Sequence, residues 1–94
     1  MYFQYDPRVS LEENQRTLRD FLPILKNVHV FCITDKNERY FIGDEQRRGK
    51  EMWQGFIDII KEAEIDTNIL IEFLPEPTSE ALIGEAEVLR SLCG

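Results

Sequence analysis

The sequence predicts an α/β domain built from three βα units with a parallel sheet, and residues 1–94 are expected to form a single domain. Three short runs of apolar, β-branched and aromatic residues lie at 1–5, 25–33 and 68–75. Each run is followed by a stretch whose apolar residues recur at helical spacing. Strands and helices that alternate in this way indicate parallel strands joined by right-handed crossovers.

The first unit is predicted from its aromatic residues and from a helix-start pattern. Residues 1–5 are aromatic and β-prone, which favours a short strand. Ser10 and Glu13 have the spacing of a capping box, in which each side chain satisfies a free backbone N–H of the other residue. A helix is therefore expected over residues 11–22, before Pro23 stops it.

The second unit places a histidine inside a strand. Residues 25–33 are mostly β-branched or aromatic and include His29, and turn-forming residues close the run. A polar loop over 34–50 follows, with a brief extended segment at 40–42. A helix is then predicted over 50–64, because the apolar residues there form a wide stripe of helical period: Met52, Trp53, Phe56, Ile57, Ile59, Ile60 and Ala63.

The third unit places a carboxylate near the end of an apolar strand. Glu72 lies within the run 68–75, where an unpaired charge would be strongly unfavourable, so it needs a partner or a cation. Open parallel sheets and barrels keep their chemistry at the carboxyl ends of strands. Thr78 or Ser79 caps a last helix, whose apolar residues are expected on one side: Leu82, Ile83, Ala86, Leu89 and Leu92.

Composition excludes several classes of partner. The chain has 43% hydrophobic and 31% charged residues and a net charge of -7, which argues against binding to nucleic acid or to an anionic membrane. The N-terminus has no export pattern, so a cytoplasmic location is expected. Cys32 and Cys93 have no metal-type spacing and are expected to be reduced thiols with packing roles.

A parallel sheet of three strands is an incomplete fold on its own. Its two edges present unpaired backbone groups. Helices normally cover both faces of a parallel sheet, but only three helices are predicted. The sequence therefore looks like part of a larger sheet, completed by oligomerisation.

Several segments together resemble a known family. They are residues 2–4, the helix that ends at 21–23, the NVHVF strand at 27–31, the helix that contains Trp53, the LIEF strand at 70–73, and the closing helix at 80–92. These segments resemble the C-terminal part of the xylose isomerase-like TIM barrels, and in particular the sugar phosphate isomerase/epimerase family. The resemblance covers essentially the whole chain and corresponds to the last three of the eight βα units.

The resemblance implies a metal site at the mouth of the barrel. In the family, the histidine of the penultimate strand and the glutamate of the last strand bind a divalent metal; these residues match His29 and Glu72. The family glutamate often also takes part in proton transfer. The third ligand, commonly an aspartate, has its nearest match in Gln4. A further glutamate has no counterpart because the earlier strands are absent, so whether the isolated chain is an enzyme is left open.

The donor types themselves are consistent with this site. Oxygen ligands with one imidazole suit Mn²⁺, Mg²⁺, Zn²⁺ or Co²⁺, and an incomplete site would hold no cofactor. Other interpretations remain open, because a histidine in an apolar strand can be a hydrogen-bonded core residue and a buried glutamate can pair with Lys or Arg. Arg47 and Arg48, with Lys50, lie in the loop expected to overhang the site and could hold a substrate phosphate, unless this loop is simply solvated.

Two functions follow from the sequence. The first is the C-terminal fragment of a metal-dependent sugar or sugar phosphate isomerase/epimerase, incomplete as an enzyme until a complementing N-terminal barrel chain supplies the missing strands. The second is a stand-alone, non-catalytic α/β homo-oligomer with an unknown ligand role.

Overall fold

The computed structural model describes residues 2–72, 74–76 and 78–94. Within these residues the chain forms a three-stranded parallel sheet, a two-stranded antiparallel sheet, three α-helices and one 3-10 turn. The elements are β1 (Tyr2–Phe3), α1 (Leu11–Phe21), η1 (Leu22–Ile24), β2 (Asn27–Val30), β3 (Cys32–Ile33), β4 (Arg39–Tyr40), α2 (Gly49–Ala63), β5 (Asn68–Ile71) and α3 (Ser79–Cys93). The predicted α/β fold with a parallel sheet is confirmed.

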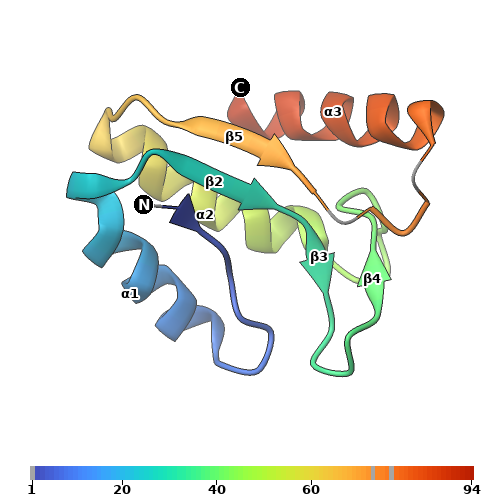
Figure 1. Ribbon diagram of the computed structural model, residues 1–94, viewed down its shortest axis with the longest axis horizontal. Coiled ribbons are helices and arrows are strands. Elements are labelled where there is room, and N and C mark those ends of the chain that lie inside the picture. Colours follow the sequence, from blue (N-terminus) through green and yellow to red (C-terminus); the bar gives the residue numbers. More distant parts are fainter. Residues whose placement is uncertain (1, 73, 77) are drawn as a thin grey trace.

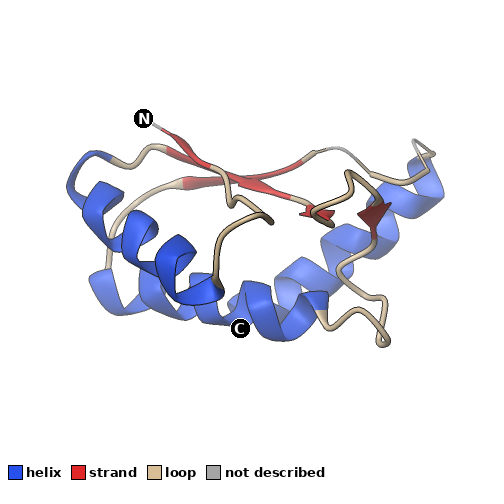
Figure 2. Ribbon diagram, turned by 90° about the horizontal axis from the view of Figure 1, so that it is seen from below, coloured by secondary structure: helices blue, strands red, loops and turns tan. Residues whose placement is uncertain are grey.

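The main sheet follows the order of the chain. β2 lies between β1 and β5, and both pairings are parallel (Figure 1). Figure 2 shows the three helices on one side of this sheet. In the part of the chain that the structure describes, no helix covers the other side. The domain therefore has one helical layer and one sheet layer, and alternate strand residues point to very different surroundings.

The core lies between the sheet and the helices. Phe3, Val28 and Val30 point from the strands into it and are fully buried. Trp53 and Phe56 of α2 meet them from the other side and are also fully buried. Trp53, Phe3 and Phe56 are the largest fully buried side chains, and two of them come from the apolar stripe predicted for the second helix. None of the helices in the described residues is both long and apolar enough to cross a membrane.

The predicted starts of α1 and α3 are confirmed by their caps. The Ser10 hydroxyl accepts a hydrogen bond of 3.1 Å from the Glu13 N–H. The Thr78 hydroxyl accepts one of 3.1 Å from the Ala81 N–H, so Thr78 and not Ser79 caps α3. Each cap satisfies a backbone donor that the first turn of a helix leaves free. The helix bounds accordingly fall within one residue of those predicted.

The strand predicted over 25–33 is wrong in its extent. β2 ends at Val30, and β3 pairs antiparallel with β4 in a separate sheet. The reason lies in two buried side chains. The Trp53 indole N–H donates to the Phe31 carbonyl at 2.9 Å. The Tyr5 hydroxyl bridges the N–H and the carbonyl of Ile33.

The apolar side predicted for the last helix is also partly wrong. Leu89 is buried as expected, but Leu82 and Ile83 are 47% and 60% exposed. Glu85 is buried instead, because its carboxylate accepts hydrogen bonds from backbone N–H groups of the loop before α2. Because of this polar contact, Glu85 lies on the buried side of α3 and Leu82 does not.

Gly49 at the start of α2 has no room for a side chain. A Cβ atom there would lie 3.2 Å from both the Cα and the carbonyl oxygen of Ile42, and 3.0 Å from the Cys32 sulfur. We expect Gly49→Ala to lower the free energy of unfolding by about 1–3 kcal/mol, because backbone atoms cannot move aside cheaply. Urea denaturation followed by circular dichroism measures this change.

Gly55, in the middle of the same helix, is the matched control. A Cβ atom there would meet the Nε2 atom of Gln15 at 2.9 Å, and that atom ends a flexible side chain. Gly55→Ala should therefore stabilise the protein by up to about 1 kcal/mol, through the better helix propensity of alanine. A Gly49→Ala variant as stable as wild type would contradict the close packing of α2 on Ile42.

Candidate functional site

The side of the sheet that faces away from the helices carries the candidate residues. We call this side, formed by Tyr2, Gln4, His29, Leu70 and Glu72, the open face. His29 lies opposite Leu70 in the register of β2 and β5. Tyr2 and Leu70 are strongly exposed there, whereas the alternate residues of β1 and β2 are buried in the core.

His29 and Glu72 meet on the open face. The His29 Nδ1 atom lies 3.1 Å from a carboxylate oxygen of Glu72, and the two side chains are 20% and 35% exposed. Glu72 directly follows β5, and its backbone N–H donates to the Val30 carbonyl at 3.0 Å. This ladder bond continues the β2–β5 pairing by one step, so both side chains stand at the carboxyl ends of neighbouring parallel strands. The structure therefore brings together the two residues that the resemblance predicts as metal ligands, on one side of the sheet.

Tyr2 completes the arrangement from β1. Its ring stacks on the imidazole of His29, with the ring centroids 4.5 Å apart and the planes within 8° of parallel. Sequence reasoning did not identify this residue. The alternation of side chains gave a signal, because Tyr2 lies two residues before Gln4 and so points to the same side of a strand.

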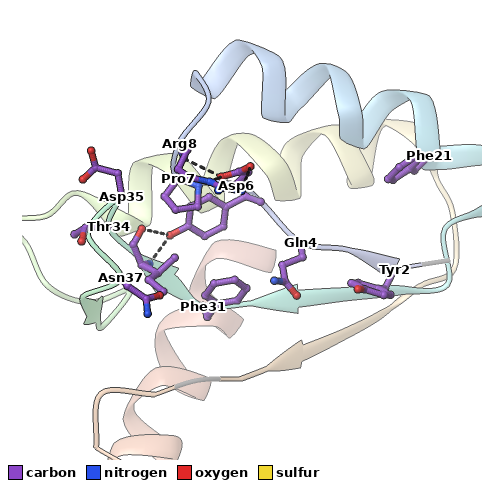
Figure 3. Close-up of a pocket in the computed structure, with 12 residues that line it drawn as sticks. Tyr2, Gln4, Asp6, Pro7, Arg8, Phe21, Phe31, Thr34, Asp35 and Asn37 are labelled. Atoms are coloured by element: carbon purple, nitrogen blue, oxygen red, sulfur yellow. Dashed lines mark hydrogen bonds and ion pairs between the residues drawn. The ribbon is translucent and has the colours of Figure 1, made fainter.

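Gln4 borders a cavity next to this group. The cavity has a volume of about 770 Å³ and lies between β1, the β1–α1 loop and the β3–β4 turn. Figure 3 shows Gln4 between Tyr2 and Phe31 along β2. Gln4 is exposed, and the described residues give its amide no hydrogen bond. Its role as a third ligand stays a prediction.

The charged residues of the cavity are partly paired. Arg8 and Asp6 form an ion pair at its rim, with 3.1 Å between Nε and Oδ1. The side-chain hydrogen bond from Arg8 lowers the pKa of Asp6 below its usual value. Asp35 and Asn37 reach the same cavity from the β3–β4 turn. The cavity therefore presents both carboxylate and amide groups to a ligand.

Of the two arginines predicted to bind substrate, Arg47 contacts the β3–β4 hairpin. The Arg47 Nη2 atom lies 3.7 Å from the Glu38 carboxylate, and its guanidinium stands 5.6 Å from the centre of the Tyr40 ring. Arg48 adopts a left-handed backbone conformation just before α2. Their role in holding a phosphate stays a prediction.

The donors on the open face fit a divalent metal in kind but not in number. His29 and Glu72 supply an imidazole and a carboxylate, yet their contact with each other already occupies one atom of each. Among the described residues, no three His, Cys, Asp or Glu side chains gather closely enough to hold a metal ion. His29 and Glu72 alone therefore do not complete a metal site.

The two cysteines differ in environment. Cys32 is buried against Ile42 and Gly49, and burial raises the pKa of its thiol to about 12. This thiol is therefore protonated and unreactive at neutral pH. Cys93 is exposed, so the packing role predicted for it is wrong.

An apolar groove runs along the outer edge of the sheet. It has a volume of about 450 Å³ and lies between β5 and α3, where it is lined by Ile69, Leu70, Ile71, Leu82, Ala86, Leu89, Arg90, Cys93 and Gly94. Leu82, which lines this groove, is 47% exposed.

Comparisons of this chain with protein-family models, with curated proteins and with solved structures found no match.

Proposed function

We propose that the chain forms the C-terminal three βα units of a metal-dependent sugar or sugar phosphate isomerase/epimerase-like TIM barrel, and that it is incomplete as an enzyme on its own. The sheet supports this proposal in two ways. Its three parallel strands follow chain order, and its helices lie on one side only. A barrel wall is built in the same way, with helices outside and strand side chains pointing inward.

The contact between His29 and Glu72 is the observation that carries the proposal. The two side chains come from neighbouring strands, lie 3.1 Å apart and stand at the carboxyl ends on the open face. In barrel enzymes this end of the strands bears the reacting groups. An imidazole and a carboxylate within hydrogen-bond reach can take up and release protons, as isomerisation of a sugar requires.

The metal belongs to the completed barrel in this proposal. A bound divalent ion would polarise the hydroxyl and carbonyl oxygens of the substrate. His29 and Glu72 would contribute two of its ligands, and Gln4 is the nearest candidate for a third. Missing strands would supply the others, because the donors on the open face are too few.

The edges of the sheet support completion by another chain. The groove between β5 and α3 leaves Leu82 exposed, where a neighbouring βα unit would cover it. The neighbour would be a second copy of this chain or a complementing N-terminal barrel chain. A reducing location such as the cytoplasm agrees with the two free cysteines.

The same groove supports an alternative function. A non-catalytic α/β protein that associates with itself through β5 and α3 would bury these apolar residues without any missing strands. In that case the pair on the open face would have no role in binding a metal. The two functions therefore differ in what His29 and Glu72 do.

Calorimetric titration with Mn²⁺ separates the two functions. We expect the wild-type chain to bind weakly, and the double variant His29→Ala/Glu72→Gln to lose at least about tenfold in affinity, because both ligands are removed. Glu62→Gln, which removes an exposed carboxylate from α2, should leave the heats unchanged. Equal heats for wild type and the double variant would overturn the metal-site proposal and favour the alternative.

A further inference from the structure

The cavity of about 770 Å³ lies between two loops that hydrogen bonds hold in place. In the β1–α1 loop, the buried side chain of Asn14 accepts from the Asp6 N–H at 2.8 Å and donates to the Asp6 carbonyl at 2.9 Å. In the β3–β4 turn, the Thr34 hydroxyl accepts from the N–H groups of Lys36 and Glu38 at 3.3 and 3.1 Å. The walls are therefore formed before a ligand arrives, which is typical of sites for small molecules.

The charged side chains that line the cavity leave one negative charge unpaired. Arg8 and Asp6 compensate each other, because Nε and Nη2 of Arg8 donate to the two carboxylate oxygens at 3.1 and 3.2 Å. Asp35 is exposed, and within the described part of the chain its carboxylate has no hydrogen bond or ion pair. The cavity therefore favours a cation over an anion, and the net charge of -7 on the whole chain acts in the same direction.

Aromatic side chains line the cavity away from this charge. Figure 3 shows Asp35 and Asn37 at one end of the group and Tyr2 and Phe21 at the other. Phe31 lies between the two ends. Aromatic rings pack against other flat rings and attract organic cations. A carboxylate at one end and aromatic rings along the rest match a ligand that has an ammonium group on a short aromatic body.

We propose that this cavity binds a small arylalkylamine, with its ammonium group at Asp35 and its ring against Phe31 and Tyr2. The side-chain oxygen of Asn37 would accept a second hydrogen bond from the ammonium group. Neither His29 nor Glu72 lines the cavity. The inference therefore goes beyond the proposed function, because it needs neither a metal nor the missing strands.

The proposal is tested by titrating the full chain with 2-phenylethylamine and following the backbone amides by ¹H–¹⁵N NMR at neutral pH and low salt. We expect the largest shifts at residues that line the cavity, in particular residues 4, 34, 35 and 37. 2-Phenylethanol has the same ring without the charge and should bind at least about threefold more weakly, because it forms no ion pair with Asp35. 3-Phenylpropionate, which carries a negative charge, should bind more weakly than the alcohol.

A variant of Asp35 tests the position of the ammonium group. Asp35→Asn should lower the affinity for 2-phenylethylamine by about three- to tenfold and leave the affinity for 2-phenylethanol unchanged, because the substitution removes the charge and keeps the shape. Asp20→Asn removes an exposed carboxylate from α1 and is the control for net charge. Its affinity for the amine should equal that of the wild type.

Variants of Tyr2 test the position of the ring. Tyr2→Leu should weaken the binding of the amine and of the alcohol to the same degree, and Tyr2→Phe should restore both. Because Tyr2 is 53% exposed, these variants are expected to fold, and circular dichroism checks this.

Three results would overturn the proposal: no amide shifts at the cavity, equal binding of the amine and the alcohol, or equal affinity of wild type and Asp35→Asn for the amine. Unchanged binding in Tyr2→Leu would overturn the position given to the ring. No measurement in this series uses a metal or alters His29 or Glu72. Its failure is therefore distinguishable from a failure of the Mn²⁺ titration.

Discussion

Trp53→Ala is expected to lower the free energy of unfolding by about 3–5 kcal/mol, the usual range for removing a buried aromatic ring. Trp53 is completely buried and packs edge-on against Tyr5 and Phe56, with ring centroids 6.0 and 5.1 Å apart. Its indole N–H also donates to the Phe31 carbonyl at 2.9 Å. The substitution therefore creates a cavity and removes the indole hydrogen bond to the Phe31 carbonyl. Urea denaturation followed by circular dichroism measures the loss.

Trp53→Phe separates the two contributions. A phenyl ring keeps most of the volume but cannot donate to Phe31, so we expect a smaller loss of about 1–3 kcal/mol. The substitution should also weaken the junction between β2 and β3, so the backbone amides of residues 30–33 should exchange their hydrogens faster. If Trp53→Phe were as stable as wild type, the indole hydrogen bond would not explain the division of the strand.

Glu85→Leu is expected to lower the free energy of unfolding by about 3 kcal/mol, because it takes the charged acceptor away from two backbone donors. Glu85 is only 5% exposed, and its carboxylate accepts hydrogen bonds from the N–H groups of Ile42 at 2.7 Å and Gly43 at 3.3 Å. These bonds join α3 to the loop before α2. Thermal and urea unfolding, analysed together, measure the change.

Two control variants make the Glu85 prediction specific. Glu85→Gln keeps one oxygen acceptor of similar shape and should lose less, about 1 kcal/mol. Glu87→Leu removes an exposed carboxylate from the same helix and should stay within about 0.5 kcal/mol of wild type. Equal stabilities for Glu85→Leu and Glu87→Leu would show that the buried carboxylate does not hold the loop.

Local patterns predicted the helices and the parallel order, because these depend on neighbouring residues. Ser10 and Pro23 lie within two residues of the helix that they delimit. The division of the strand at Phe31 depends instead on Trp53, which is 22 residues away in the sequence. The orientation of α3 depends on bonds from Glu85 that span 42 and 43 residues. No periodicity within a single segment contains this information.

The candidate site, like the fold, could be predicted only in part from the sequence. Glu72 was singled out because it stands near the carboxyl end of an apolar strand, and His29 because the resemblance matches it to a histidine of the penultimate strand. The stack of Tyr2 on His29 depends on the exact register of β1 against β2, in which Tyr2 lies opposite Asn27. A shift of one residue would point Tyr2 into the core. Sequence alone does not determine this register, because β1 is only two residues long.

The order of the main sheet limits how copies of this domain could add to one another. β1 and β5 form its opposite edges, and all three strands run in one direction. If β5 of one copy paired in parallel with β1 of the next, every helix would stay on the same side. Such head-to-tail growth uses two different surfaces and does not stop at a dimer. Head-to-tail growth ends only when the twist of the strands brings the last sheet edge back to the first. The curvature of the combined sheet, and not a two-fold axis, would therefore set the number of copies.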